Sequence, residues 1–93
     1  LKECSGDTRV TSTVDRQYMW LAQTPQGARC KIMQEAFAAW DCDANGLPTD
    51  ESMMLESIGQ QPQLVACSNP NFKLTTPTDL HVAEALLQCG TIK

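Results

Sequence analysis

The chain has 93 residues and a formal net charge of −4, with 42% hydrophobic and 19% charged residues. This length fits one domain, and the composition is typical of a globular protein rather than a disordered one. No apolar run approaches the roughly 20 residues that cross a bilayer, so a membrane span is not expected. The acidic balance disfavours nucleic acid as a partner, because a phosphate backbone would be repelled.

The first expected element is a helix over residues 8–23. Apolar side chains recur at helical spacing from Val10 through Val14 and Tyr18 to Leu21, and this spacing places them on one face. The Thr and Val content of the segment makes such a helix intrinsically weak.

A second helix is expected to begin at Thr24 and Pro25. Threonine is a good N-cap, and proline suits the first helical position, where its missing N–H costs nothing. An apolar face follows, and it predicts a helix over residues 27–41. Asn45-Gly46 then ends it, since this pair favours left-handed backbone geometry.

Shorter elements are expected in the second half of the chain. A helix over residues 49–59 precedes a helix of one or two turns over 62–67, a turn at 69–71 and a brief extended piece at 72–75. The last helix runs from 76 to 89. Its first turn holds the cap, the proline and the acid expected of a helix start: Thr76, Pro77 and Asp79. The sequence therefore predicts an all-α fold, a bundle of four to five helices in one domain over residues 1–93.

Cysteine spacing predicts a disulfide framework. The five cysteines are dispersed along the whole chain, at Cys4, Cys30, Cys42, Cys67 and Cys89. In a short chain this pattern is typical of proteins from oxidising compartments, so a secreted, extracellular or periplasmic location is expected. An odd number leaves one thiol free or paired between chains. A Cys30–Cys42 bridge is disfavoured, because one helix would separate the two residues by about 18 Å.

The segment from Asp41 to Gly46 resembles half of a calcium-binding EF-hand loop. Asp41, Asp43 and Asn45 supply oxygens at loop positions 1, 3 and 5, and Gly46 occupies position 6. Ser52 stands at position 12, where a bidentate carboxylate is needed. An Asn-Gly turn beside an acidic helix cap is therefore favoured over a metal site, and no metal or other cofactor is expected.

Catalysis is not expected from these residues. His81 is the only histidine, and on the last helix it shares a polar face with Glu84 and Gln88. No serine or acid pattern places a nucleophile and an orienting carboxylate beside it. The chain is therefore interpreted as a binding protein and not an enzyme.

Methionine and aromatic side chains form an adaptable apolar set. Methionine fills irregular spaces and tolerates ligands of varied shape. Composition alone favours an ordinary packed core over a ligand cavity. The side chains expected to line such a cavity are Tyr18, Met33, Phe37, Trp40, Met53, Met54, Leu64 and Leu87.

A family resemblance favours the cavity. The order of Cys4, Cys30, a Leu-Pro-Thr helix start at 47–49, the stretch 70–78 and a last helix ending in Cys89 resembles the elicitins of oomycetes. Those small secreted helical proteins have three disulfides and carry sterols and fatty acids.

The resemblance also implies two alternative cysteine pairings. This chain has five cysteines where elicitins have six, and Phe72 stands at one framework position. The resemblance then implies Cys30–Cys67 with Cys42–Cys89, or Cys4–Cys67 with Cys42–Cys89.

The favoured interpretation is a secreted protein that binds a sterol or fatty acid between its helices. The alternative is a protein-interaction module, an effector or inhibitor, that binds a basic partner through an acidic face. That face is suggested by the stretch between Ile32 and Phe72, which holds six acids and no Lys or Arg. A degenerate EF-hand domain ranks third.

Overall fold

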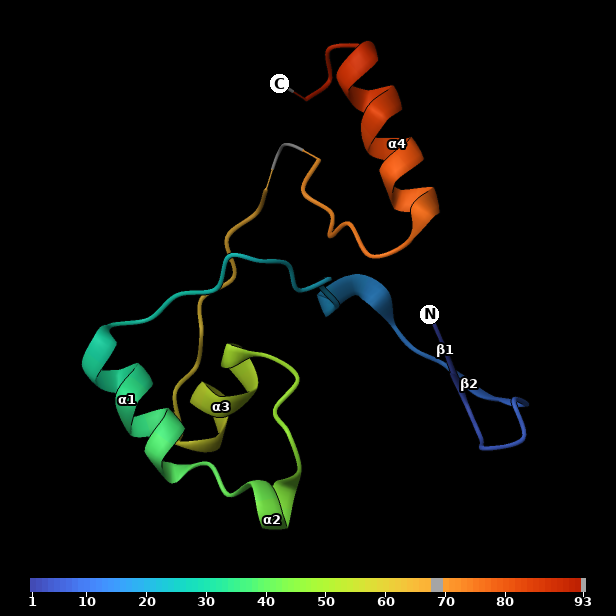
Figure 1. Ribbon diagram of the computed structural model, residues 1–93. Helices are drawn as coiled ribbons and strands as arrows, with labels where there is room; N and C mark the ends of the chain where they lie inside the picture. The colour runs from blue at the N-terminus through green and yellow to red at the C-terminus, as the bar shows by residue number, and fades with distance from the viewer. Residues whose placement is uncertain (68–69, 93) are drawn as a thin grey trace.

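The chain begins with a β-hairpin, seen in a computed structural model that describes residues 1–67 and 70–92 (Figure 1). Strand β1 (Lys2–Cys4) pairs antiparallel with β2 (Val10–Thr13), with a bulge after Glu3. Backbone hydrogen bonds of 3.0 Å close the turn, from the Ser5 N–H to the Arg9 carbonyl and from the Thr8 N–H to the Ser5 carbonyl. The β-branched residues of β2 suit an extended backbone.

The expected helix over residues 8–23 is therefore wrong. After the hairpin the chain makes only a 3₁₀ turn, η1 (Arg16–Tyr18), capped by Asp15, whose carboxylate accepts a 3.0 Å hydrogen bond from the Gln17 N–H. Its apolar stripe is left exposed, with Tyr18 at 84% and Leu21 at 90%. The low helix propensity of Val and Thr outweighed the spacing of the apolar residues.

Helix α1 (Cys30–Ala39) starts later than expected. Thr24 and Pro25 do not open it: the peptide bond between them is cis, and the chain stays non-helical up to Arg29, the N-cap residue. The helix ends at Trp40, whose N–H bonds the Ala36 carbonyl at 3.1 Å.

The corner after α1 is built around Asp41. Its carboxylate accepts hydrogen bonds from the N–H groups of Asp43 (2.9 Å) and Ala44 (3.2 Å), which caps the single turn α2 (Cys42–Asn45). Gly46 follows with a φ of 71°, so the left-handed Asn-Gly geometry is confirmed. Trp40 closes the corner, because its indole N–H donates a 2.9 Å bond to the Gly46 carbonyl.

Helix α3 (Glu51–Ser57) packs against α1, and their contact holds the core. Its N-cap is Asp50, which accepts a 2.8 Å bond from the Met53 N–H, and Gly59 follows the helix with a φ of 82°. The short helix expected over 49–59 is thus present, in a shorter form. Ala36 is fully buried, and Met54 and Leu55 are 4% and 5% exposed. The side chains that pack around these three are Ile32, Met33, Trp40 and Ile58.

The chain is irregular between α3 and the last helix. Residues 60–67 have no regular secondary structure, so the helix expected over 62–67 is wrong. Residues 70–75 carry neither a helix nor a ladder of strand hydrogen bonds. The turn expected at 69–71 lies partly outside the described residues.

Helix α4 (Pro77–Gln88) is the expected last helix. Its start is confirmed as a capping box: Thr76 Oγ1 accepts a 3.2 Å bond from the Asp79 N–H, and Asp79 Oδ2 accepts a 2.8 Å bond from the Thr76 N–H. Cys89 is the C-cap, and Gly90 has a φ of 76°.

These elements do not form a closed bundle. Among the described residues, the only pairs of elements in contact are β1 with β2 and α1 with α3, and Figure 1 shows α4 and the hairpin standing away from the α1–α3 unit. The radius of gyration is 17.3 Å, against about 12 Å for a compact chain of this length. The expected all-α bundle is wrong: the chain is an open α/β segment with a two-stranded sheet and separate helices. No helix within residues 1–67 and 70–92 has the length and apolarity that a membrane crossing needs.

The expected disulfide framework is also wrong. Within the described residues no disulfide joins any two of the five cysteines, and all five are exposed. With the helices apart, the implied pairings Cys30–Cys67, Cys4–Cys67 and Cys42–Cys89 are all absent.

Candidate functional site

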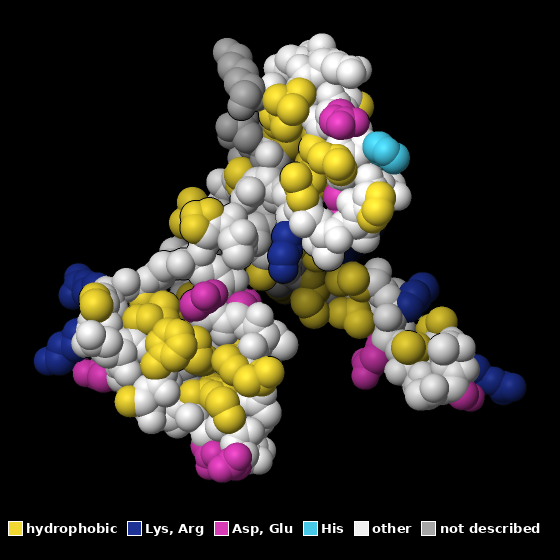
Figure 2. Space-filling view, viewed as in Figure 1, with side chains coloured by type: hydrophobic (Ala, Val, Ile, Leu, Met, Phe, Trp, Pro, Cys, Tyr) yellow, Lys and Arg dark blue, Asp and Glu magenta, His cyan; other side chains and the backbone are white. Residues whose placement is uncertain are grey.

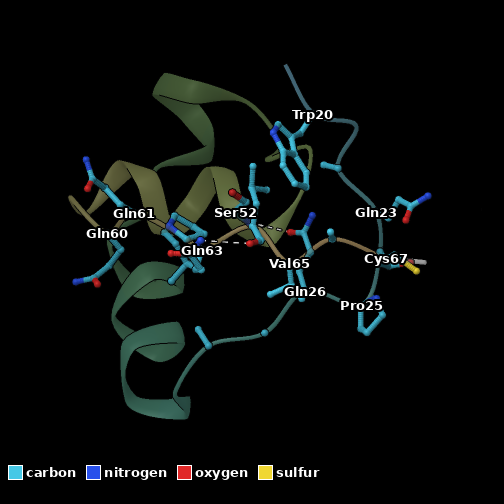
Figure 3. Close-up of a pocket in the computed structure, with 18 of the residues that line it drawn as sticks. Trp20, Gln23, Pro25, Gln26, Ser52, Gln60, Gln61, Gln63, Val65 and Cys67 are labelled. Carbon is cyan, nitrogen blue, oxygen red and sulfur yellow. Dashed lines mark hydrogen bonds between the residues drawn. The ribbon is translucent and has the colours of Figure 1, made fainter. Parts of the chain in front are cut away.

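A pocket lies between two irregular segments of the chain. Residues 20–29 and 60–67 line a pocket of about 940 Å³, and α1 and α3 contribute Ile32, Ser52 and Leu55 to its wall. Figure 3 shows Trp20, Gln26, Ser52 and Gln63 around this space. The segments are far apart in sequence, so the pocket depends on how the first segment is fastened to α3.

Gln26 fastens the first segment to the start of α3. Its Nε2 donates a 3.0 Å hydrogen bond to Asp50 Oδ2, and its Oε1 accepts a 3.0 Å bond from the Ser52 N–H. The second of these bonds is drawn in Figure 3. Gln26 thus satisfies one of the helix N–H groups that lack an intrahelical partner. The amide of Gln26 and the N–H of Met53 lower the pKa of the Asp50 carboxyl below its ordinary value, because both donate to the ionised form.

Asn71 holds the same segment from the other side. Its Nδ2 donates a 2.7 Å hydrogen bond to the Thr24 carbonyl, 47 positions away in sequence. Asn71 also lines the pocket. Two carboxamide side chains therefore fix residues 24–26 between α3 and the segment that precedes α4.

The described residues that line the pocket have apolar side chains, carboxamides and one charged side chain. Trp20, Leu21, Leu64 and Val65 supply apolar surface, and all four are more than half exposed. Arg29 is the only charged side chain among the described lining residues. Carboxamides both donate and accept hydrogen bonds, and a guanidinium pairs with phosphate or carboxylate. The site therefore has groups for a polar, anionic ligand and open apolar surface for packing.

The structure does not bring the expected cavity residues together. Of the eight, Leu64 lines the pocket, while Met33, Trp40 and Met54 belong to the packed core of α1 and α3. The others are exposed on separate elements: Tyr18, Phe37, Met53 and Leu87.

The possible calcium ligands have structural roles or none. Asp41 caps α2, while Asp43 and Asn45 lie within that single turn. In the part of the chain that the structure describes, no group of three or more His, Cys, Asp or Glu side chains could hold a metal ion. His81 lies on α4, outside the pocket.

Comparison with known proteins identifies the family. The profile of IspD, 2-C-methyl-D-erythritol 4-phosphate cytidylyltransferase, matches residues 1–89. The chain belongs to the IspD family. A 2-C-methyl-D-erythritol 4-phosphate cytidylyltransferase of Syntrophus aciditrophicus is 42% identical over 89 residues, which are 95% of this chain and 37% of that protein. The enzyme of that name from Thiobacillus denitrificans is 43% identical over 91 residues, 94% of this chain and 37% of its own length.

A fused relative shows the same partial overlap. The bifunctional enzyme IspD/IspF of Anaeromyxobacter dehalogenans is 44% identical over 80 residues, 86% of this chain and 20% of that protein. The chain therefore spans little more than a third of the length of these IspD relatives, and less of the fused one.

Membership of the IspD family overturns the functional expectations. The resemblance to elicitins is wrong, and with it a sterol or fatty acid as ligand, because the match over residues 1–89 is to a family named for an enzyme. The expectations of a non-enzymatic binding protein, of an effector or inhibitor using an acidic face, and of a degenerate EF-hand are wrong for the same reason. The secreted location depended on disulfides that the structure does not form, and the IspD match gives it no support.

Sequence reasoning missed the residues that build the pocket. Gln26, Arg29 and Asn71 lie in segments that the sequence patterns predict to be helical or a turn. A weak signal was present, since Thr24-Pro25 lacks an acid three residues after the threonine, where Gly27 stands. That absence argues against a helix start and for an extended segment.

Proposed function

We propose that this chain forms part of a cytidylyltransferase that acts on 2-C-methyl-D-erythritol 4-phosphate. The observation that carries the proposal is the IspD match over residues 1–89, together with identities of 42–43% to enzymes of that name. The chain spans 37% of those enzymes, so the proposal concerns its share in the reaction.

The chemistry of cytidylyl transfer indicates which side chains this chain would need in order to take part in the reaction. A phosphate oxygen of the acceptor attacks the α-phosphorus of CTP, and pyrophosphate leaves. Both substrates carry phosphates, and such reactions depend on positioning and on cations that stabilise the developing negative charge. Basic side chains near a pocket are therefore the groups to consider.

One described cation lines the pocket, and a second lies near a lining residue in sequence. Arg29 lines it, and Lys73 follows the lining residue Asn71 by two positions. Lys31 lies on α1 outside the lining, and Arg9 is 3.5 Å from the Asp7 carboxylate in the hairpin. We therefore assign phosphate contacts to Arg29 and Lys73.

A chimeric enzyme tests the proposal. This chain replaces the matching segment of the Thiobacillus denitrificans relative, and product formation from CTP and 2-C-methyl-D-erythritol 4-phosphate is followed by pyrophosphate release. We expect turnover, and a loss in kcat/KM of roughly 10- to 100-fold for Arg29→Gln or Lys73→Gln. Lys31→Gln is the matched control and should leave turnover unchanged. A folded chimera without turnover would refute the proposed function. Wild-type rates in both test variants would refute the assignment of the two cations.

A further inference from the structure

The segment that carries Lys73 is held at both of its ends. Before Lys73, the Asn71 Nδ2 donates a 2.7 Å hydrogen bond to the Thr24 carbonyl. After it, the Thr75 N–H donates a 3.0 Å hydrogen bond to Asp79 Oδ2 at the start of α4. Lys73 therefore lies midway between two attachment points that are close together in sequence.

The attachment at Asn71 leads back to the packed core. Gln26 fastens residues 24–26 to the start of α3 through two 3.0 Å hydrogen bonds, and α3 packs on α1 around buried side chains. The same support leads along the chain to Arg29, the N-cap residue of α1. The hydrogen bond from Asn71 to the Thr24 carbonyl thus joins the two segments that carry the cations assigned to phosphate.

An exposed lysine needs such a support if it is to act at a defined place. Lys73 is exposed, and Figure 2 shows basic side chains open to solvent between α4 and the α1–α3 unit. A lysine ammonium is a point charge on a flexible four-carbon stem, so its position depends on where the backbone is held. Two residues span at most about 7 Å. The hydrogen bond of Asn71 therefore limits how far the Lys73 backbone can move from the pocket wall.

We propose that Asn71 is a positioning residue that holds Lys73 where it can contact a substrate phosphate. This inference rests on the proposed function, in which Lys73 supplies that contact. The Asn71 carboxamide donates to the Thr24 carbonyl, so it acts through the backbone of its own segment and not on the substrate. A misplacement of about 1 Å can cost roughly 100-fold in rate. Loss of this hydrogen bond should therefore slow the reaction even though Lys73 is still present.

A double-mutant cycle in the chimeric enzyme separates positioning from a general loss of stability. Asn71→Ala should lower kcat/KM roughly 10-fold when Lys73 is present. In the Lys73→Gln background the same change should cost less than about twofold, because no cation is left to position. Gln34→Ala is the matched control, since it truncates an exposed carboxamide on α1 outside the pocket lining. It should leave kcat/KM unchanged.

A second measurement on this chain itself needs no catalysis. NMR order parameters of the backbone N–H groups of residues 72–74 should fall below about 0.6, the range of flexible backbone, in the Asn71→Ala variant. The order parameters of α1 should keep their wild-type values, and Gln34→Ala should change neither region. Unchanged order parameters at residues 72–74 in Asn71→Ala would overturn the proposal.

The remaining outcomes distinguish this inference from the proposed function. Equal effects of Asn71→Ala with and without Lys73 would overturn the positioning role in an active chimera, and so would wild-type rates in Asn71→Ala. Wild-type rates in Lys73→Gln would overturn the cation assignment and the positioning role together. A folded chimera without turnover would refute the proposed function, and the order parameters would then decide whether Asn71 holds Lys73 in place.

Discussion

The carboxamide of Gln26 and the carboxylate of Asp50 join parts of the chain 24 residues apart through one 3.0 Å hydrogen bond. The other end of the same carboxamide accepts from the Ser52 N–H. Replacing Gln26 by Leu removes both bonds, and we expect a loss of about 1–2 kcal/mol in the free energy of unfolding of the α1–α3 unit. Denaturant unfolding followed by circular dichroism measures it.

Exchanging the amide and the carboxylate between positions 26 and 50 provides the control for this interaction. Gln26→Glu places two carboxylates face to face and Asp50→Asn removes the acceptor charge, so each single change should destabilise the unit. In the double variant the amide introduced at position 50 could donate to the carboxylate introduced at position 26, which could still accept from the Ser52 N–H. We expect the double variant to be more stable than the sum of the single effects predicts. Additive losses would contradict a direct interaction.

The core between α1 and α3 is small, so its few buried side chains should dominate stability. Leu55 is 5% exposed and Phe37, also on this unit, is 59% exposed. We expect Leu55→Ala to cost about 2 kcal/mol or more, because it leaves a cavity, and Phe37→Ala about 0.5 kcal/mol or less. Chemical denaturation of the two variants measures the difference. Equal losses would mean that the unit packs differently.

The stability of the first turn of α4 should depend on pH through the carboxyl group of Asp79. The N–H groups of Thr76 and Thr75, and then the Thr76 hydroxyl, lower the pKa of its carboxyl from 3.8. A lowered pKa means that this carboxylate stabilises the helix fully above pH 3.8, and that the contribution is lost as the pH falls through the lower folded value. We expect the amide signals of the first turn of α4 to report this loss by NMR. Asp79→Asn should remove the dependence, and an unchanged titration in that variant would assign it to another group.

Reducing agents should leave the fold unaffected. Cys4, Cys30, Cys42 and Cys89 are exposed free thiols. We expect all four to be alkylated without denaturant, as counted by mass spectrometry, and the Tm to be the same with and without reductant. A fall in Tm on reduction would show that disulfides stabilise the chain after all.

Cys89 should react at lower pH than an ordinary thiol. Its Sγ lies 2.9 Å from Thr91 Oγ1, and the side chain and backbone of Thr91 lower the pKa of the thiol by hydrogen bonding to the thiolate. Thr91→Val removes the hydroxyl, so the alkylation profile of Cys89 should move to higher pH. Thr91→Ser keeps the hydroxyl and should retain the wild-type profile.

The sequence predicted a helix start correctly where the cap residue, the proline and the acid were all present. Thr76, Pro77 and Asp79 form a complete helix start within four residues, and α4 begins there. Thr24-Pro25 has the first two parts only, and the chain stays non-helical up to Arg29. The capping interaction links residues three apart, so its presence is visible in the sequence.

The pocket could not be predicted in this way. Gln26 reaches Asp50 and Asn71 reaches Thr24, over 24 and 47 positions, and no periodicity encodes such contacts. The cysteines led to a wrong prediction of disulfides and secretion, because a short chain with many cysteines is typical of secreted proteins. The relatives are more than twice as long, so the shortness that supported that inference does not hold for the family.

The two tryptophans report on different parts of the molecule. Trp40 is hydrogen-bonded to the Gly46 carbonyl beside the core, whereas Trp20 is 57% exposed on the pocket wall. Loss of the α1–α3 packing would expose Trp40 and shift its fluorescence to longer wavelength. Covering the pocket would remove water from Trp20 and shift its emission to shorter wavelength. The chain thus contains two intrinsic optical probes of opposite sign, one for unfolding and one for occupation of the pocket.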